Sequence, residues 1–175
     1  MKTPKGIVIF FVAIVCALFL AAPAVAAVSL NAYEKQLLTA VNKQRAKHGL
    51  RELRVNAKLV DAARAHSTDM SERKYFEHTS PDGETWSSRI VRYGYTGEGC
   101  SYWKAGENIY YGAGLYSSPY VVVKAWMGSK THRAVILTKV FRDIGVGAAK
   151  TDDGYGNIGG VVWFFTLDLG RRVVK

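Results

Sequence analysis

The sequence predicts an α+β domain in which helices come first along the chain and paired strands come last. Apolar residues recur at helical spacing through the first half of the chain. Runs of β-type residues follow near the C-terminus, at 144–148 and 161–166. No internal repeat, low-complexity segment or long linker divides the chain. We therefore expect one domain in which helices are layered on an antiparallel pair of strands.

The N-terminal segment has the three parts of a secretory signal peptide. Lys2 and Lys5 are basic, an apolar run follows, and residues 24–26 are the small residues Ala-Val-Ala that a signal peptidase requires. The strongly apolar part, 7–20, is shorter than the ~20 residues that span a bilayer. We expect residues 1–26 to be cleaved and the protein to be secreted or held in the cell envelope. Retention of this segment as a membrane anchor is the alternative.

The remainder of the chain is basic and has one cysteine. Loss of Lys2 and Lys5 lowers the net charge from +10 to +8, which still favours anionic partners such as wall polymers and lipid head groups. The basic residues are scattered, and several, including Arg45, have helical surface spacing. We therefore expect a solvated face and no nucleic-acid site. Cys100 has no partner for an internal disulfide, so the domain depends on its core alone.

Two long helices are predicted at the start of the domain. Apolar residues at helical spacing indicate a helix over 31–47, and Gly49 follows it as a stop signal. Asn56 is a suitable N-cap for a second helix over 57–73. The tetrapeptide Ser-Pro-Asp-Gly at 80–83 then predicts a β-turn, because Pro fixes the second position and Asp-Gly suits the bend.

Shorter elements follow this turn. A helix is predicted over 85–93, after which a segment at 106–111 is compatible with either a strand or a loop. Ser118 before Pro119 indicates a helix start, since Pro is tolerated in the first helical position. After a break at 129–132 another short helix is expected to end at Leu137.

Three residues could form a chemical site. His78 directly precedes the predicted turn, and His132 is the last residue of the helix break, after Ser-Lys-Thr at 129–131. Glu107 lies among apolar and aromatic residues, where a carboxylate is costly unless it is paired. Brought together by folding, these side chains would form a cation site or a general acid/base pair. Their spacing matches no local metal motif, so only the fold could bring them together.

The other two histidines are predicted to be structural. His48 stands at the end of the first helix, where an imidazolium suits the helix dipole. His66 lies within the second helix, three residues before Asp69, a spacing that allows a hydrogen bond between them.

Five motifs that recur in this order make the chain resemble a known family. They are 38–45 (LTAVNKQR), 75–83 (YFEHTSPDG), 105–109 (AGENI), 125–133 (AWMGSKTHR) and 144–147 (IGVG). Over about residues 30–170 the chain resembles the CAP superfamily in its prokaryotic form. This superfamily is also called SCP-like, or cysteine-rich secretory, antigen 5 and pathogenesis-related-1. The resemblance implies an α-β-α sandwich with helices on both faces of a small antiparallel sheet.

The resemblance also implies a cleft with two histidines and two acidic residues. Cleft histidines of some relatives bind a divalent cation such as zinc. By motif position His78 matches the first histidine and Glu107 the first acid, whereas Ser129 stands where a second glutamate is expected. The last strand, at 163–166, has no histidine, so His132 is expected to be the second one. The implied site is a triad of His78, Glu107 and His132 with open metal positions.

Two functions are compatible with this sequence. The first is an extracellular binding module that presents its cleft to a wall polymer, a lipid or a protein; we expect a membrane partner only if the signal segment is retained. The basic charge, the tyrosines at 110–120 and the family's lack of one general enzymatic activity favour it. The second is a hydrolase, either metal-dependent or using Ser129 with His132 and Glu107. A serine at a helix start more often caps the helix, which favours the binding module.

Overall fold

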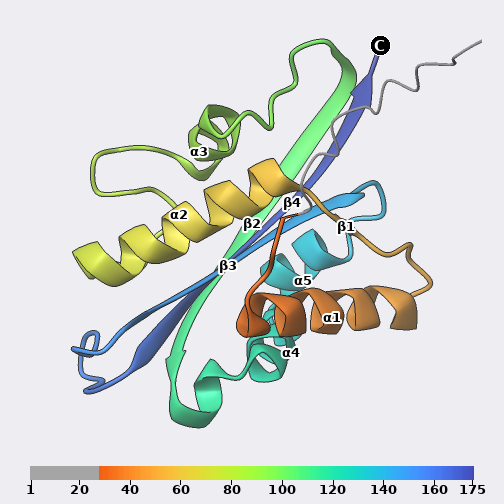
Figure 1. The fold of residues 1–175 in the computed structure, drawn as a ribbon. Helices are drawn as coiled ribbons and strands as arrows, with labels where there is room; N and C mark the ends of the chain where they lie inside the picture. The colour runs from red at the N-terminus through yellow and green to blue at the C-terminus, as the bar shows by residue number, and fades with distance from the viewer. Residues whose placement is uncertain (1–27) are drawn as a thin grey trace, which may run out of the picture.

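The computed structural model describes residues 28–175, which fold into three layers (Figure 1). The middle layer is a sheet with the strand order β1-β3-β4-β2, formed by Arg54–Val55 (β1), Asp143–Thr151 (β3), Val162–Val174 (β4) and Cys100–Ala113 (β2). One face is covered by α2 (Ala57–Arg73) and α3 (Trp86–Arg92). The other is covered by α1 (Ala32–Lys47), α4 (Pro119–Gly128) and α5 (Lys130–Ile136). The predicted α-β-α sandwich is confirmed.

The sheet is built around β4. This strand pairs antiparallel with β3 on one side and with β2 on the other, and β1 pairs parallel with β3. The long strands are therefore antiparallel as predicted, while β1 makes the sheet mixed. The segment 106–111, for which strand and loop were both left open, is strand, and it belongs to a much longer strand that begins at Cys100. Within the described part of the chain the Cys100 thiol is free.

Local capping sets where the helices begin. The Asn31 side chain accepts from the Glu34 backbone N–H, and the Glu34 carboxylate accepts from the Asn31 N–H, which forms a capping box before α1. Asn56 caps α2 as predicted, and Thr85 caps α3. The helix predicted at Pro119 also begins there.

Two glycines of β3 allow α2 to lie directly on the sheet. A Cβ atom at Gly145 would meet the backbone carbonyl carbon of Leu59 at 2.1 Å, and one at Gly147 would meet that of Ala63 at 2.3 Å. No side chain fits between these backbones. The contact therefore fixes the height and the rotation of α2 over the sheet, and with them the positions of His66 and Asp69.

The two faces of the sheet have different cores. The face under α1, α4 and α5 carries one large apolar cluster that includes Leu37, Trp126 and Phe165. The face under α2 and α3 carries two smaller clusters, one around Leu59 and one around Met70. Between these two clusters the buried side chains are polar: His66, Ser67, Arg89, Glu107, Thr166 and Asp168.

One basic residue contradicts the expected solvated face. Arg45 is fully buried, and its guanidinium donates to the backbone carbonyls of Arg51, Ile136 and Thr138. The prediction is wrong for Arg45 because backbone carbonyls accept from its buried guanidinium. These carbonyls stand at the end of a helix or in a loop, where no N–H of a helix or strand bonds to them. Arg45 thereby ties the end of α1 to the segment after α5.

The segment expected to be a signal peptide, 1–26, lies outside the described residues. Among residues 28–175, no helix has the length and apolar character needed to cross a bilayer.

Candidate functional site

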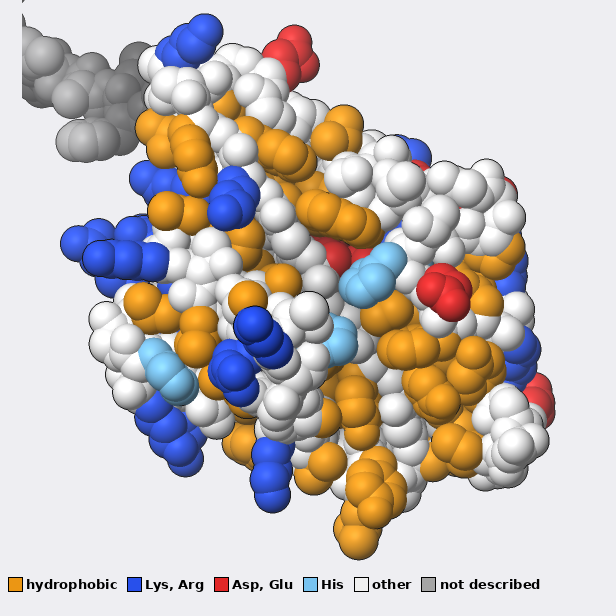
Figure 2. Space-filling model, turned by 180° about the vertical axis from the view of Figure 1, so that it is seen from behind, with side chains coloured by type: hydrophobic (Ala, Val, Ile, Leu, Met, Phe, Trp, Pro, Cys, Tyr) orange, Lys and Arg blue, Asp and Glu red, His pale blue; other side chains and the backbone are white. Residues whose placement is uncertain are grey.

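A cleft of about 810 Å³ opens beside β2, which is an edge strand of the sheet. Its walls are mainly aromatic and apolar: Phe76, Ile109, Tyr110, Tyr111, Tyr116, Trp126 and Ile158. The polar side chains that line it include His78, Ser129 and His132. Figure 2 shows this hollow, with histidine side chains at its rim and an acidic side chain in its depth. The fold therefore brings both predicted site histidines to one cleft.

His78 and Glu107 form the polar pair at one end of the cleft. The His78 Nδ1 lies 2.7 Å from the Glu107 Oε1. The side chain of Glu107 is 1% exposed, whereas that of His78 is 44% exposed. Because an ionised carboxylate only accepts, the His78 Nδ1 carries the hydrogen and its Nε2 keeps a lone pair. A carboxylate on one ring nitrogen fixes both the tautomer and the orientation of the imidazole.

Arg89 supplies the charge that allows Glu107 to be buried. Its Nη2 donates to the Glu107 Oε2 at 2.9 Å and to the His78 backbone carbonyl at 3.1 Å. Its Nη1 donates to the Ser80 Oγ at 3.3 Å. The Arg89 side chain is only 2% exposed, so this is a buried ion pair. Arg89 therefore holds both the carboxylate and the backbone of the loop that carries His78.

Asp168 lies opposite Glu107 in the β2–β4 pairing, so both side chains leave the sheet on the α2 face. Asp168 is fully buried, and neither of its carboxyl oxygens has a hydrogen-bond partner among the described residues. Burial raises the pKa of the Asp168 carboxyl well above its usual range, and the Glu107 charge raises it further. Both effects favour the neutral form of the Asp168 carboxyl over the charged form, whereas the positive charge of Arg89 favours the charged form.

His132 and Ser129 reach the cleft from α5 and the residue before it. His132 lies in the first turn of α5, not in the break before it as we expected, and its backbone carbonyl accepts from the Asn108 Nδ2 at 3.0 Å. Burial lowers the pKa of the His132 imidazole, and the positive charge that nearby His78 carries when it is protonated lowers it further. The Ser129 hydroxyl pairs with the Thr131 hydroxyl at 3.1 Å and caps no backbone N–H. The expected capping role of Ser129 is wrong.

The geometry sets what these residues could do chemically. Within 28–175 the Ser129 hydroxyl has no hydrogen bond to His132, so a nucleophile–base pair is not assembled. Also within that range, no group of three or more His, Cys, Asp and Glu side chains is arranged to hold a metal. Both Glu107 oxygens already accept hydrogen bonds, from His78 and from Arg89. The atoms left to bind a cation are therefore the His78 Nε2 and the nitrogens of the His132 ring. Two imidazoles fit a cation site completed by water or ligand and do not fit a closed four-ligand zinc site.

His66 supports this site from within α2. It is fully buried, and its Nε2 donates to the Glu77 backbone carbonyl at 3.0 Å, next to His78. The expected partner of His66, Asp69, instead accepts from the Tyr75 hydroxyl at 2.5 Å, and that hydroxyl lies 3.3 Å from the His66 Nδ1. His66 is thus structural as predicted, with a different partner. The fourth histidine, His48, is exposed at the C-terminal end of α1, also as predicted.

Sequence reasoning missed Arg89 and Asp168. Asp168 had a usable signal, since a carboxylate within the apolar run 162–169 is costly for the same reason as Glu107. Arg89 had none, because it lies in a short helix whose packing against the sheet is not visible in the sequence.

Comparison with known proteins identifies the family. Residues 38–169 match CAP, the cysteine-rich secretory protein family. The chain belongs to this family. The CAP chain is 41% identical over 119 residues to the protein YkwD of Bacillus subtilis (strain 168), covering 68% of this chain and 43% of YkwD. It is 35% identical over 115 residues to the membrane protein YlbC of the same strain, covering 65% of this chain and 31% of YlbC. The chain therefore spans less than half the length of these relatives.

Solved structures share the fold. An extracellular SCP-domain protein of Bacillus anthracis has a TM-score of 0.60 at 27% identity, covering 82% of this chain and 40% of that one. An outer surface protein of Borrelia burgdorferi has a TM-score of 0.63 at 25% identity, covering 79% and 91%. The predicted CAP resemblance is confirmed, and these structural neighbours are extracellular or outer-surface proteins.

Proposed function

We propose that this CAP protein works outside the cytoplasm as a binding module and that the cleft beside β2 is its ligand site. The cleft carries the proposal: at about 810 Å³ it falls within the range of small-molecule pockets, roughly 300–1,000 Å³. Location outside the cytoplasm rests on the signal-like N-terminal segment, and the extracellular structural neighbours support it.

The lining of the cleft defines the chemistry of the ligand. Aromatic walls from Phe76, Tyr111 and Trp126 suit an apolar body. At one end, the His78 Nε2 and the His132 ring offer a hydrogen bond or a positive charge to a polar group. An amphipathic ligand meets both requirements. Among wall polymer, lipid and protein, the cleft therefore favours a ligand with an apolar part.

A dye that combines fused apolar rings with a sulfonate, anilinonaphthalene sulfonate, is a direct probe of this site. Ala125 lines the cleft on an exposed face of α4, so Ala125→Trp fills the cleft without changing the core. Ala46→Trp, at the exposed end of α1, is the matched control. We expect fluorescence titration to show binding to the wild type and to Ala46→Trp, and loss of binding in Ala125→Trp. Equal binding to both variants would refute the cleft as ligand site.

We further propose that the same cleft binds a divalent cation such as zinc through His78 and His132. The observation that favours it is the His78–Glu107 pair at 2.7 Å, because the carboxylate directs the free Nε2 of the imidazole outward. Glu107 is then an orienting residue, since both its oxygens are engaged. A metal-dependent hydrolase, the alternative function, would use this same cation site.

Calorimetric zinc titration tests the cation site. We expect binding by the wild type, loss of binding in the double variant His78→Ala/His132→Ala, and unchanged binding in His48→Ala, whose ring lies at the end of α1. Equal weak heats from the wild type and the double variant would end the cation proposal. They would leave the dye-binding result untouched, so the two proposals fail separately.

A further inference from the structure

The charge of the chain is unevenly distributed around the cleft. Between Glu107 and Asp143 the sequence has no acidic residue and five basic ones: Lys124, Lys130, Arg133, Lys139 and Arg142. This stretch forms the end of β2, the 3-10 turn Gly114–Ser117 (η1), α4 and α5. Every Lys, Arg, Asp or Glu in this stretch is therefore basic, which the overall net charge does not reveal.

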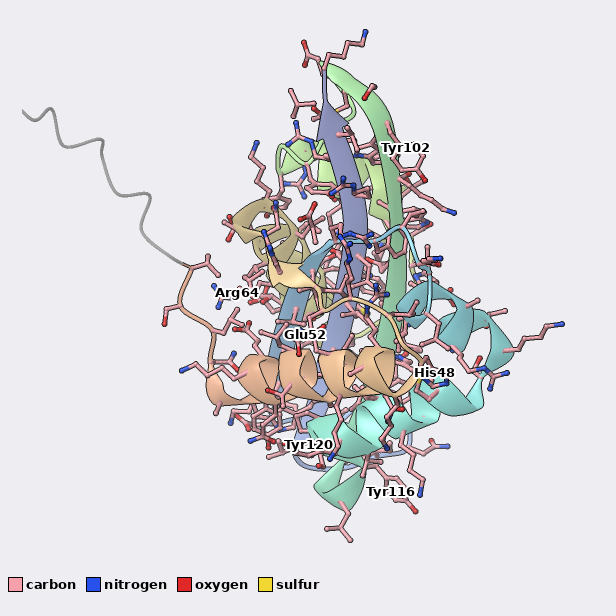
Figure 3. All side chains as sticks on the ribbon, turned by 90° about the vertical axis from the view of Figure 1, so that its right-hand side faces the viewer. His48, Glu52, Arg64, Tyr102, Tyr116 and Tyr120 are labelled. Carbon is pink, nitrogen blue, oxygen red and sulfur yellow. The ribbon has the colours of Figure 1, made fainter. Side chains whose placement is uncertain are left out.

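Three large hydrophobic side chains protrude at the start of this stretch. Leu115 is 88% exposed, Tyr116 70% and Tyr120 52%, and Leu115 is the most exposed large hydrophobic residue in the described part of the chain. We name these three residues the apolar tip. Figure 3 shows Tyr116 and Tyr120 together at one end of the molecule. Single exposed apolar residues are ordinary, whereas a group at a protruding corner indicates a contact surface.

The backbone of the apolar tip is held in place. Gly114 has a φ of +56°, a left-handed conformation that favours glycine, at the turn out of β2. The Ser117 hydroxyl donates to the Gly114 carbonyl at 2.7 Å, and a Cβ at Gly112 would meet the Tyr116 carbonyl oxygen at 2.7 Å. The packed turn thus directs Leu115 and Tyr116 outward.

The basic residues lie beside the apolar tip. Tyr120 and Lys124 are both exposed and are one helical turn apart on α4, so they share a face. Lys130 and Arg133 follow, exposed, on α5. In Figure 2, Lys and Arg side chains gather toward the lower left of the molecule, and hydrophobic side chains project from its lower edge.

We propose that the apolar tip and the lysines of α4 and α5 dock the protein on an anionic lipid bilayer. Tyrosine and leucine suit the boundary between head groups and acyl chains, and lysines next to them meet the lipid phosphates. A soluble anionic polymer would pair with the lysines but would leave Leu115 in water. A bilayer accounts for both the exposed apolar tip and the lysines next to it. Tyr116 also lines the cleft, so this docking places the mouth of the cleft at the membrane surface. The proposal does not depend on what the cleft binds.

Vesicle flotation tests the docking surface with residues 28–175, which contain every described helix and strand. Cooperative thermal unfolding is checked first for each variant. The vesicles contain equal parts phosphatidylglycerol and phosphatidylcholine, with pure phosphatidylcholine for comparison. We expect binding to the anionic vesicles, weakening with salt. We expect roughly tenfold or greater loss of binding in Lys124→Gln/Lys130→Gln and a similar loss in Leu115→Ser/Tyr116→Ser.

The control is a matched pair at the far end of β2. Tyr102→Ser/Lys104→Gln removes one exposed aromatic and one exposed lysine, and Tyr102 lies at the opposite end of the molecule from Tyr116 (Figure 3). We expect this variant to bind vesicles like the wild type. Equal vesicle binding by all the variants, or none by the wild type, would overturn the proposal. Binding to soluble polyphosphate without vesicle binding would assign the surface to an anionic polymer and would also overturn it.

Discussion

His66 is the residue through which we expect moderate acid to destabilise the fold. Its imidazole is fully buried in α2, and its Nε2 donates to the Glu77 carbonyl at 3.0 Å. Burial lowers the pKa of His66 to about 4, from 6.5 for the free side chain. Arg89 also lowers it, while Glu107 and Asp69 oppose the shift. A proton is therefore taken up by the unfolded chain at a higher pH than by the folded protein.

The sign and size of the effect follow from this difference. The stability due to neutral His66 is fully present above pH 6.5 and is lost as the pH falls from 6.5 through about 4. At about 1.4 kcal/mol per pKa unit, the complete loss amounts to roughly 3 kcal/mol. A domain of this size is stable by about 5–15 kcal/mol in total, so the loss is large enough to measure.

Urea unfolding of residues 28–175 at about pH 7.5 and pH 4.5 measures this loss. His66→Gln is the informative variant, because the amide N–H can still donate to the Glu77 carbonyl and does not titrate. We expect the wild type to lose about 2–3 kcal/mol more than His66→Gln between these pH values. His48→Gln removes an exposed histidine and should behave like the wild type. Parallel losses in the wild type and His66→Gln would refute the reasoning.

Three further predictions concern buried positions and are read from urea unfolding at neutral pH. Glu107→Gln removes the carboxylate that pairs with the buried Arg89 guanidinium and should cost about 3–5 kcal/mol; a cost below about 1 kcal/mol would show that Arg89 reaches water or that Asp168 takes over the negative charge. Asp168→Asn replaces the carboxyl by a neutral amide of the same shape and should cost less than about 1 kcal/mol, because burial favours the neutral form of Asp168. A cost equal to that of Glu107→Gln would mean that Asp168 is ionised. Gly147→Ala forces a methyl group into the Ala63 backbone and should cost about 1–3 kcal/mol or more, whereas Gly128→Ala, with open space around it, should be neutral or stabilising. Equal effects of the two glycine variants would contradict the close contact of α2 with β3.

Elements whose signals are local could be predicted from the amino-acid sequence. Asn56 caps α2 and Pro119 begins α4 as predicted, because capping and the proline preference involve residues within one turn of each other. The ordered motifs, including those of His78 and Glu107, also indicated the family and therefore the layers of the sandwich. These properties need no knowledge of which distant residues meet.

The pairing of charges and the burial of side chains depend on contacts between distant parts of the chain and could not be predicted from local patterns. Arg89 pairs with Glu107 because α3 packs over the α2 face of the sheet, and Asp168 lies opposite Glu107 because of the register between β2 and β4. Arg45 has the spacing of a surface residue and is nevertheless buried, because the backbone carbonyls of Ile136, at the end of α5, and of Thr138 accept from its guanidinium. A buried charge is tolerated where other parts of the chain supply its partners. A short stretch of sequence does not show which distant residues those partners are.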